Sequence, residues 1–143
     1  MFIVVHVVAG IALSKHLHNP FYAFVLCWCF HFLLDVIPHG DGGLDKKSFF
    51  KFAAIDTALC CFPAFVIFNK IEFLFPNVVA WGVLGSILPD ILFGLSKIIK
   101  SSFLDFFANI NESAHQIIKT KISLKNGLMV QALFFLLFLL VSF

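Results

Sequence analysis

Charged side chains are scarce in this sequence. They make up 13% of its 143 residues, whereas 61% of the residues are hydrophobic and 21 are phenylalanine. A soluble domain needs a polar shell around its core, and so few charges cannot form one. The composition therefore excludes an ordinary soluble domain and predicts an integral membrane protein.

Basic residues are too few and too dispersed for a nucleic-acid partner. The net charge is only +2, and the lysines are spread over short polar connections. Phosphate backbones are bound by clustered basic side chains, so we expect no nucleic acid. No basic segment or small-residue cleavage site precedes Lys15, so the first apolar segment is expected to remain in the protein.

The motifs of several other enzyme classes are missing. The four cysteines lie in apolar runs, and none is separated from another by the two-residue gap of a zinc knuckle or redox pair. There is no glycine-rich phosphate loop, and Ser86 and Ser96 have no histidine and carboxylate beside them in a recognisable arrangement. The sequence therefore favours neither a disulfide framework nor a serine or cysteine nucleophile.

Long apolar runs, bounded by polar segments, are what the sequence does contain. They predict an all-α fold, a polytopic membrane bundle of four to five transmembrane helices in a single domain covering 1–143. The expected helices cover about 2–18, 20–37, 50–68, 78–97 and 127–143. The first is short for a membrane span, whereas the second is sharply bounded by Pro20 and Pro38.

Residues 102–119 show a different pattern, in which apolar residues recur at helical spacing among polar ones. This pattern predicts an amphipathic helix that lies in the membrane surface. Eight lysines fall in the segments 38–51 and 97–126, against Lys15 and Lys70 on the other side. The positive-inside rule then places the N-terminus and both lysine-bearing segments in the cytoplasm.

Ionisable side chains interrupt the apolar runs. They are His6, His31, Asp35, Asp56 and Asp90, with His39, Asp41 and His115 at the edges of the runs. Such groups are costly inside a membrane unless they are paired, bind a metal or face water. With alternating topology, and a rise of 1.5 Å per residue, those inside the runs fall within roughly 10 Å of the same membrane face. We therefore expect them to form one site.

The segment HFLLDVIPHGD, residues 31–41, is the densest part of this set. His31 and Asp35 are four residues apart, so they share one face of a helix. His39 follows the break at Pro38, and the glycines after it let the chain turn back over the site. An imidazole and a carboxylate so placed can bind one metal ion, whereas Asp41 has the setting of a turn residue.

Together with WGVLGSILPD downstream, this segment resembles small bacterial inner-membrane proteins known as membrane-bound metal-dependent hydrolases, which are likened to zinc-dependent phospholipase C. The resemblance covers most of residues 1–118. It implies a metal site made by His6, His31, Asp35, His39, Asp56, Asp90 and His115. This sequence departs from the family in having Phe30 before His31 and only one histidine, His115, in the last segment.

These observations lead to one hypothesis and two alternatives. The hypothesis is a membrane-embedded hydrolase that binds one or two zinc ions, with manganese or iron as alternatives, and uses Asp35 and Asp90 as catalytic or bridging carboxylates. Its expected partners are membrane lipids, with a lipid phosphate ester as substrate at the cytoplasmic surface. The alternatives are an ion- or proton-coupled transporter and a non-catalytic protein with a structural metal site.

Overall fold

The computed structural model describes residues 1–39, 51, 54–60, 65, 75–118 and 122–143. Within these residues the chain is helical and contains no strand, which confirms the all-α prediction. The helices are α1 (Ile3–Ser14), α2 (Pro20–Val36), α4 (Pro76–Ser96), α5 (Ser102–Gln116) and α6 (Leu124–Ser142). Residues 54–60 are also helical, within the predicted 50–68 helix. Asp41 and the lysines at 46, 47, 70, 119 and 121 lie outside the described residues.

Local sequence signals set the ends of α2. The Asn19 side chain accepts hydrogen bonds from the backbone N–H groups of Phe21 and Tyr22, at 2.9 and 3.2 Å, and Pro20 follows in the first helical position. The helix ends where Ile37 becomes extended, because a residue that precedes proline disfavours helical angles. Helix α2 therefore covers residues 20–36, one residue shorter than the predicted helix at 20–37.

Only α4 and α6, of 21 and 19 residues, are long and apolar enough to cross a membrane among the described residues. The prediction of four to five spans is met only in part, because α1 and α2 are shorter apolar helices. Helix α1 has 12 residues instead of the predicted 2–18, since it ends before Lys15. Its length of about 18 Å is well below a hydrocarbon thickness of about 30 Å.

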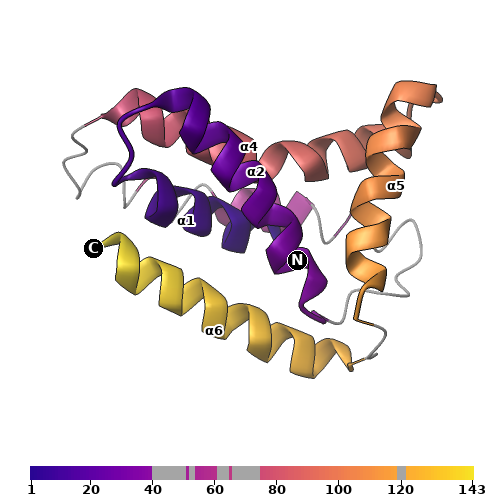
Figure 1. Ribbon diagram of the computed structural model, residues 1–143. Helices are drawn as coiled ribbons and strands as arrows, with labels where there is room; N and C mark the ends of the chain where they lie inside the picture. The colour runs from indigo at the N-terminus through magenta and orange to yellow at the C-terminus, as the bar shows by residue number, and fades with distance from the viewer. Residues whose placement is uncertain (40–50, 52–53, 61–64, 66–74, 119–121) are drawn as a thin grey trace.

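Helix α1 lies at the centre of the fold. It packs against α2, α4 and α6, and nine of its residues are buried. In Figure 1, α6 runs beside α1 in the same direction, and α5 stands across the end of the bundle. Hydrogen bonds join α1 to α6 at both ends: Phe2 N–H donates to Gln131 at 2.6 Å, and Lys15 Nζ donates to the Val141 carbonyl at 2.5 Å.

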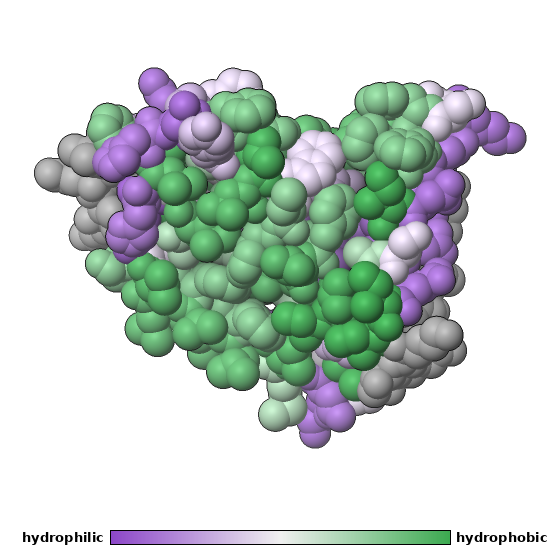
Figure 2. All heavy atoms as spheres, viewed as in Figure 1, coloured by the Kyte–Doolittle hydropathy of each residue, from purple (hydrophilic) through white to green (hydrophobic). Residues whose placement is uncertain are grey.

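The molecular surface is apolar over most of the face shown in Figure 2, with polar residues gathered toward its two sides. Helix α6 contributes exposed side chains such as Met129, Leu133 and Leu140. A monomeric soluble protein rarely leaves so large an apolar surface in water. The exposed apolar residues are therefore in accord with lipid around the bundle, as the sequence predicts.

Small residues bring the helices into close contact around α4. A Cβ atom on Gly82 would lie 2.4 Å from Ser14 Cβ of α1. A Cβ atom on Gly85 would lie 2.3 Å from the Phe24 carbonyl oxygen of α2. Such glycines allow helix backbones to approach closely in membrane bundles. They fix the distances between the three helices that carry most of the candidate site.

Substitution of Gly85→Ala is expected to destabilise the protein by about 1–3 kcal/mol, because the new methyl group overlaps a backbone atom that cannot rotate away. The measurement is the thermal unfolding midpoint of the purified protein in detergent. Gly94→Ala is the matched control in the same helix, since nothing lies within 4 Å of its Cβ position. Equal unfolding midpoints for the two variants would contradict the proposed helix contact.

Candidate metal centre

Ionisable side chains converge at one end of the bundle, where α1 begins and α2 ends. They are His6 of α1, His31 and Asp35 of α2, His39 just after α2, Asp90 of α4 and His115 of α5. Their nitrogen and oxygen atoms form two groups, and the ligand-type atoms within each group lie within 4.8 Å of one another. The structure thus brings together six of the seven residues in the predicted metal site.

The first group consists of His6, His31 and Asp90. Asp90 Oδ2 lies 3.9 Å from His6 Nε2, and Asp90 Oδ1 lies 3.8 Å from His31 Nε2. The two imidazole rings stack with centroids 4.1 Å apart, an arrangement that disfavours a positive charge on both. Neutral imidazole is the form that binds metals, so this group has the right donors for a cation.

The second group consists of Asp35, His39 and His115. His115 Nε2 lies 3.4 Å from Asp35 Oδ2, and the His39 and His115 rings have centroids 4.9 Å apart. The Met1 amino group is also present, 2.5 Å from Asp35 Oδ1 and 2.8 Å from His39 Nε2. These donors already bind one positive group, so a metal ion in the second group would compete with the Met1 amine.

Asp35 connects the two groups. Its Oδ1 atom lies 3.2 Å from His6 Nε2, and its Oδ2 atom lies 3.0 Å from His31 Nε2. The same Oδ2 atom faces His115, so one carboxylate contacts imidazoles of both groups. Asp35 would therefore contribute negative charge to a metal ion held in either group.

Backbone carbonyls fix the ring orientation of two histidines. His31 Nδ1 lies 2.8 Å from the Ser86 carbonyl oxygen, and His39 Nδ1 lies 2.7 Å from the Ile37 carbonyl oxygen. Because a carbonyl only accepts, each Nδ1 carries the proton, and the lone pair of the neutral ring is on Nε2. Metal-binding histidines commonly show this pattern, in which the nitrogen that does not bind the metal donates to a carbonyl.

Several buried polar atoms of the centre lack a hydrogen-bond partner within the described part of the chain. They are His6 Nδ1, His31 Nε2, Asp35 Oδ2 and Asp90 Oδ2. His31 Nε2 and Asp35 Oδ2 are 3.0 Å apart, yet they are not aligned as a hydrogen bond. Unsatisfied buried groups are costly, and a bound cation would satisfy these atoms together. The donor set therefore fits a metal ion.

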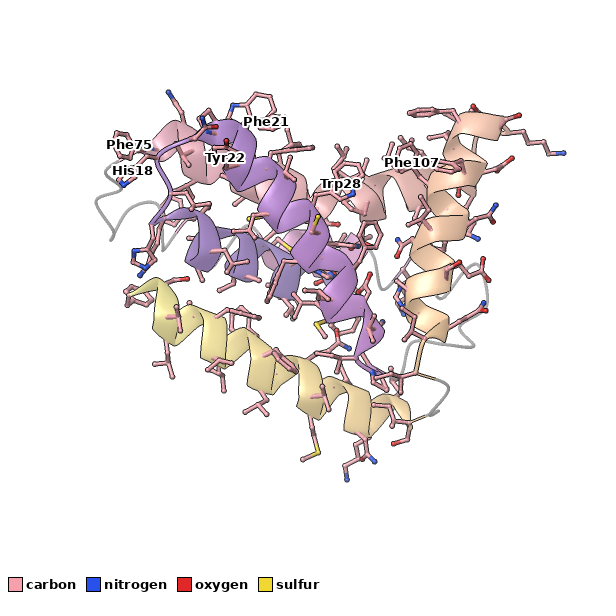
Figure 3. The ribbon with its side chains drawn as sticks, viewed as in Figure 1. His18, Phe21, Tyr22, Trp28, Phe75 and Phe107 are labelled. Carbon is pink, nitrogen blue, oxygen red and sulfur yellow. The ribbon has the colours of Figure 1, made fainter. Side chains whose placement is uncertain are left out.

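In the described part of the chain, the exposed side chains of these ion pairs belong to α4 and α5. The Asp90 side chain is 17% exposed and that of His115 is 28% exposed, whereas those of His6, His31 and Asp35 are fully buried. Access to the centre is therefore beside α5. Trp28 of α2 and Phe107 of α5 face each other in Figure 3, with ring centroids 5.9 Å apart, and hold α5 against the bundle.

Asp56 has a structural role at the start of α1 that the sequence did not predict. Its carboxylate accepts hydrogen bonds from the backbone N–H groups of Ile3 and Val4. These are among the N–H groups at the start of α1, which have no partner within the helix and receive no side-chain cap from Phe2. Asp56 is not in either metal-ligand group formed by the described residues, so its predicted metal contact stays a prediction.

The sequence analysis did not select Gln131 or Asn111. Gln131 is buried, accepts from Phe2 N–H and donates to the His39 carbonyl at 3.1 Å, which connects α6 to the centre. It is the single amide in an otherwise apolar run, a signal that was available in the sequence. Asn111 lies four residues before His115, so helical spacing places it on the same face of α5.

No family model, curated protein or solved structure matches this chain. The resemblance to membrane-bound metal-dependent hydrolases therefore remains an expectation from the motifs.

His18 lies away from the centre, in the connection between α1 and α2. Its ring packs on Phe75, with ring centroids 5.0 Å apart (Figure 3).

Substitution of Asp56→Ala is expected to lower stability by about 0.5–2 kcal/mol, because the first turn of α1 loses its cap. Metal content should be unchanged, since Asp56 caps α1 and is outside both donor groups. The measurements are the thermal unfolding midpoint and elemental analysis of the same preparation. Asp105→Ala is the control, because Asp105 is exposed in the first turn of α5. A folded Asp56→Ala protein that has lost its metal would instead make Asp56 a ligand.

Proposed function

We propose that this protein is a membrane-embedded metal-dependent hydrolase that acts on a phosphate ester of a lipid at the membrane surface. The observation that carries the proposal is the convergence of buried imidazoles and carboxylates whose polar atoms lack partners among the described residues. Intramembrane ionisable groups are retained chiefly for binding, transport or catalysis. The two apolar helices that are long enough to cross a membrane support the membrane location.

The first group, His6, His31 and Asp90, would hold the ion most readily, because the Met1 amine lies 2.5 Å from Asp35 Oδ1 and 2.8 Å from His39 Nε2 of the second group. A second ion at Asp35, His39 and His115 would displace that amine. Imidazole with carboxylate donors suits zinc, with manganese or iron as alternatives. The bound metal would lower the pKa of a water ligand and draw charge from a phosphoryl oxygen.

Asp35 and Asp90 would have different roles. Asp35 is fully buried and contacts imidazoles of both groups, so it orients them and balances their charge. Asp90 is partly exposed at the open side, and its Oδ2 atom has no hydrogen-bond partner among the described residues. Asp90 is therefore the carboxylate that a water molecule from the open side would reach, and it would accept the proton of that water.

The substrate class follows from where the centre opens. Helix α5 carries exposed apolar residues, Phe103, Phe106 and Ile110, beside polar ones, as expected of a helix in the membrane surface. Exposed Lys97 and Lys100 precede α5 and would attract anionic headgroups. An opening at headgroup depth favours an amphiphile over a fully soluble substrate. The lysine distribution supports the cytoplasmic side of the membrane for this surface.

Substitution of His31→Ala and of Asp90→Ala is expected to remove bound metal, because each deletes a donor of the first group. The measurement is metal content per protein by elemental analysis, after purification in detergent without added metal. His16→Ala is the control, since His16 is exposed between α1 and α2, away from the centre. Equal metal content in all four proteins, including none, would exclude the proposed site.

Hydrolysis is tested separately from metal binding. The metal-loaded protein should release phosphate or headgroup from mixed anionic and zwitterionic phospholipids, and a chelator should abolish that release. Asp90→Ala should lower the rate by at least about 100-fold, because it removes a metal donor and the proposed base together. A metal-loaded protein with no turnover on any lipid class would indicate a structural metal or a transport function.

A further inference from the structure

Asn111 is a buried amide that faces the candidate metal centre. Its side chain lies in α5, and the residue is 1% exposed. The other buried residues of α5 are Leu104, Ala108 and Ala114, so Asn111 is the only polar one among them. Asn111 and His115 are four residues apart, and His115 lies 3.4 Å from the Asp35 carboxylate. The face of α5 that packs on the bundle therefore brings two polar side chains to the centre.

The Asp90 carboxylate of the first group is the polar neighbour of Asn111. It lies within reach of a hydrogen bond donated by the Asn111 side-chain N–H. Asn111 Oδ1 has no hydrogen-bond partner in the part of the chain that the structure describes. Asp90 Oδ2, on the neighbouring carboxylate, is also unpartnered there. Two unsatisfied polar groups thus face the same small region.

Packing alone does not account for an asparagine at this position. An amide oxygen that is buried without a partner costs about 1–3 kcal/mol, whereas a leucine, with the same branched shape, carries no such cost. Asparagine is also a weaker helix former than leucine or alanine. An asparagine at this position is explained if its side chain binds a ligand that is not part of the protein.

We infer that the Asn111 side-chain oxygen is a fourth donor of the first group, beside His6, His31 and Asp90. The inference rests on the metal site proposed above and adds a ligand to it. An amide oxygen is an ordinary donor for Mn²⁺ and for other ions that prefer oxygen. With two imidazoles and one carboxylate it gives a set of two nitrogens and two oxygens. The first group is then complete only when α5 is packed against the bundle.

Asn111→Leu and Asn111→Asp separate this role from a packing role. The protein, stripped of metal in detergent, is titrated with Co²⁺ alone, and the dissociation constant and the visible absorption spectrum are recorded. Leucine should weaken binding at least about tenfold and change the spectrum, because a coordinating oxygen is lost. Aspartate keeps an oxygen at the same place, so its Co²⁺ affinity should equal or exceed that of the wild type.

Thermal unfolding gives a second readout that a packing role would not produce. Without metal, Asn111→Leu should unfold at the same or a higher temperature than wild type, because it removes an unsatisfied buried amide. With Co²⁺, the wild type should gain more thermal stability than the leucine variant. Asn109→Leu, at an exposed position on the same helix, is the matched control and should behave as the wild type in both states.

Three results would overturn the inference. The first is wild-type Co²⁺ affinity and spectrum in Asn111→Leu, and the second is equal weakening by leucine and aspartate. The third is loss of lipid hydrolysis in Asn111→Leu with unchanged Co²⁺ binding, which would place Asn111 on the substrate. Asn111→Ala removes the same oxygen with a smaller side chain, so the comparison does not depend on leucine being accommodated. Absence of Co²⁺ binding by the wild type itself would overturn the metal-site proposal as a whole.

Discussion

The buried carboxylate of Asp35 is the constraint on which the rest of the structure depends. An ionised carboxylate in an apolar bundle is very costly without positive or hydrogen-bonding partners. Here the partners come from far apart in the sequence: the Met1 amine and His6 from the start, His31 from the same helix and His115 from α5. The helices must therefore bring these side chains together, and the positions of α1, α2 and α5 follow from that requirement.

Helix α1 meets the requirement by being short, central and capped from outside. Its first N–H groups bond to Asp56, and small residues at Gly10 and Ser14 let α4 approach closely. Close approach matters because His6 reaches Asp90 across the α1–α4 contact. The glycine contacts therefore set the distance between α1 and α4, and the polar centre can form only at that distance.

Much of the arrangement could be predicted from the sequence, and the reasons for the rest are physical. Apolar runs and prolines gave the helices, and alternating direction placed His6, His31, Asp35 and Asp90 at one depth. The end of α1 was predicted too late, because the helix was extended beyond its apolar run toward the length of a membrane span, whereas it stops at Ser14. The roles of Asp56 and Asn111 could not be predicted, because they depend on contacts between segments that are far apart in the sequence. Spacing alone could not distinguish a carboxylate that caps a helix from one that faces a metal.

The position of α5 has a consequence for how the protein is made. Ribosomes synthesise the chain from its N-terminus, so the segments that carry His6, His31 and Asp90 leave the ribosome before residues 111–115 do. The three histidine and aspartate donors of the first group then meet inside an apolar bundle whose open side is not yet covered by α5. The donors of the first group can therefore meet before α5 packs against them, because α5 follows α4 in the chain.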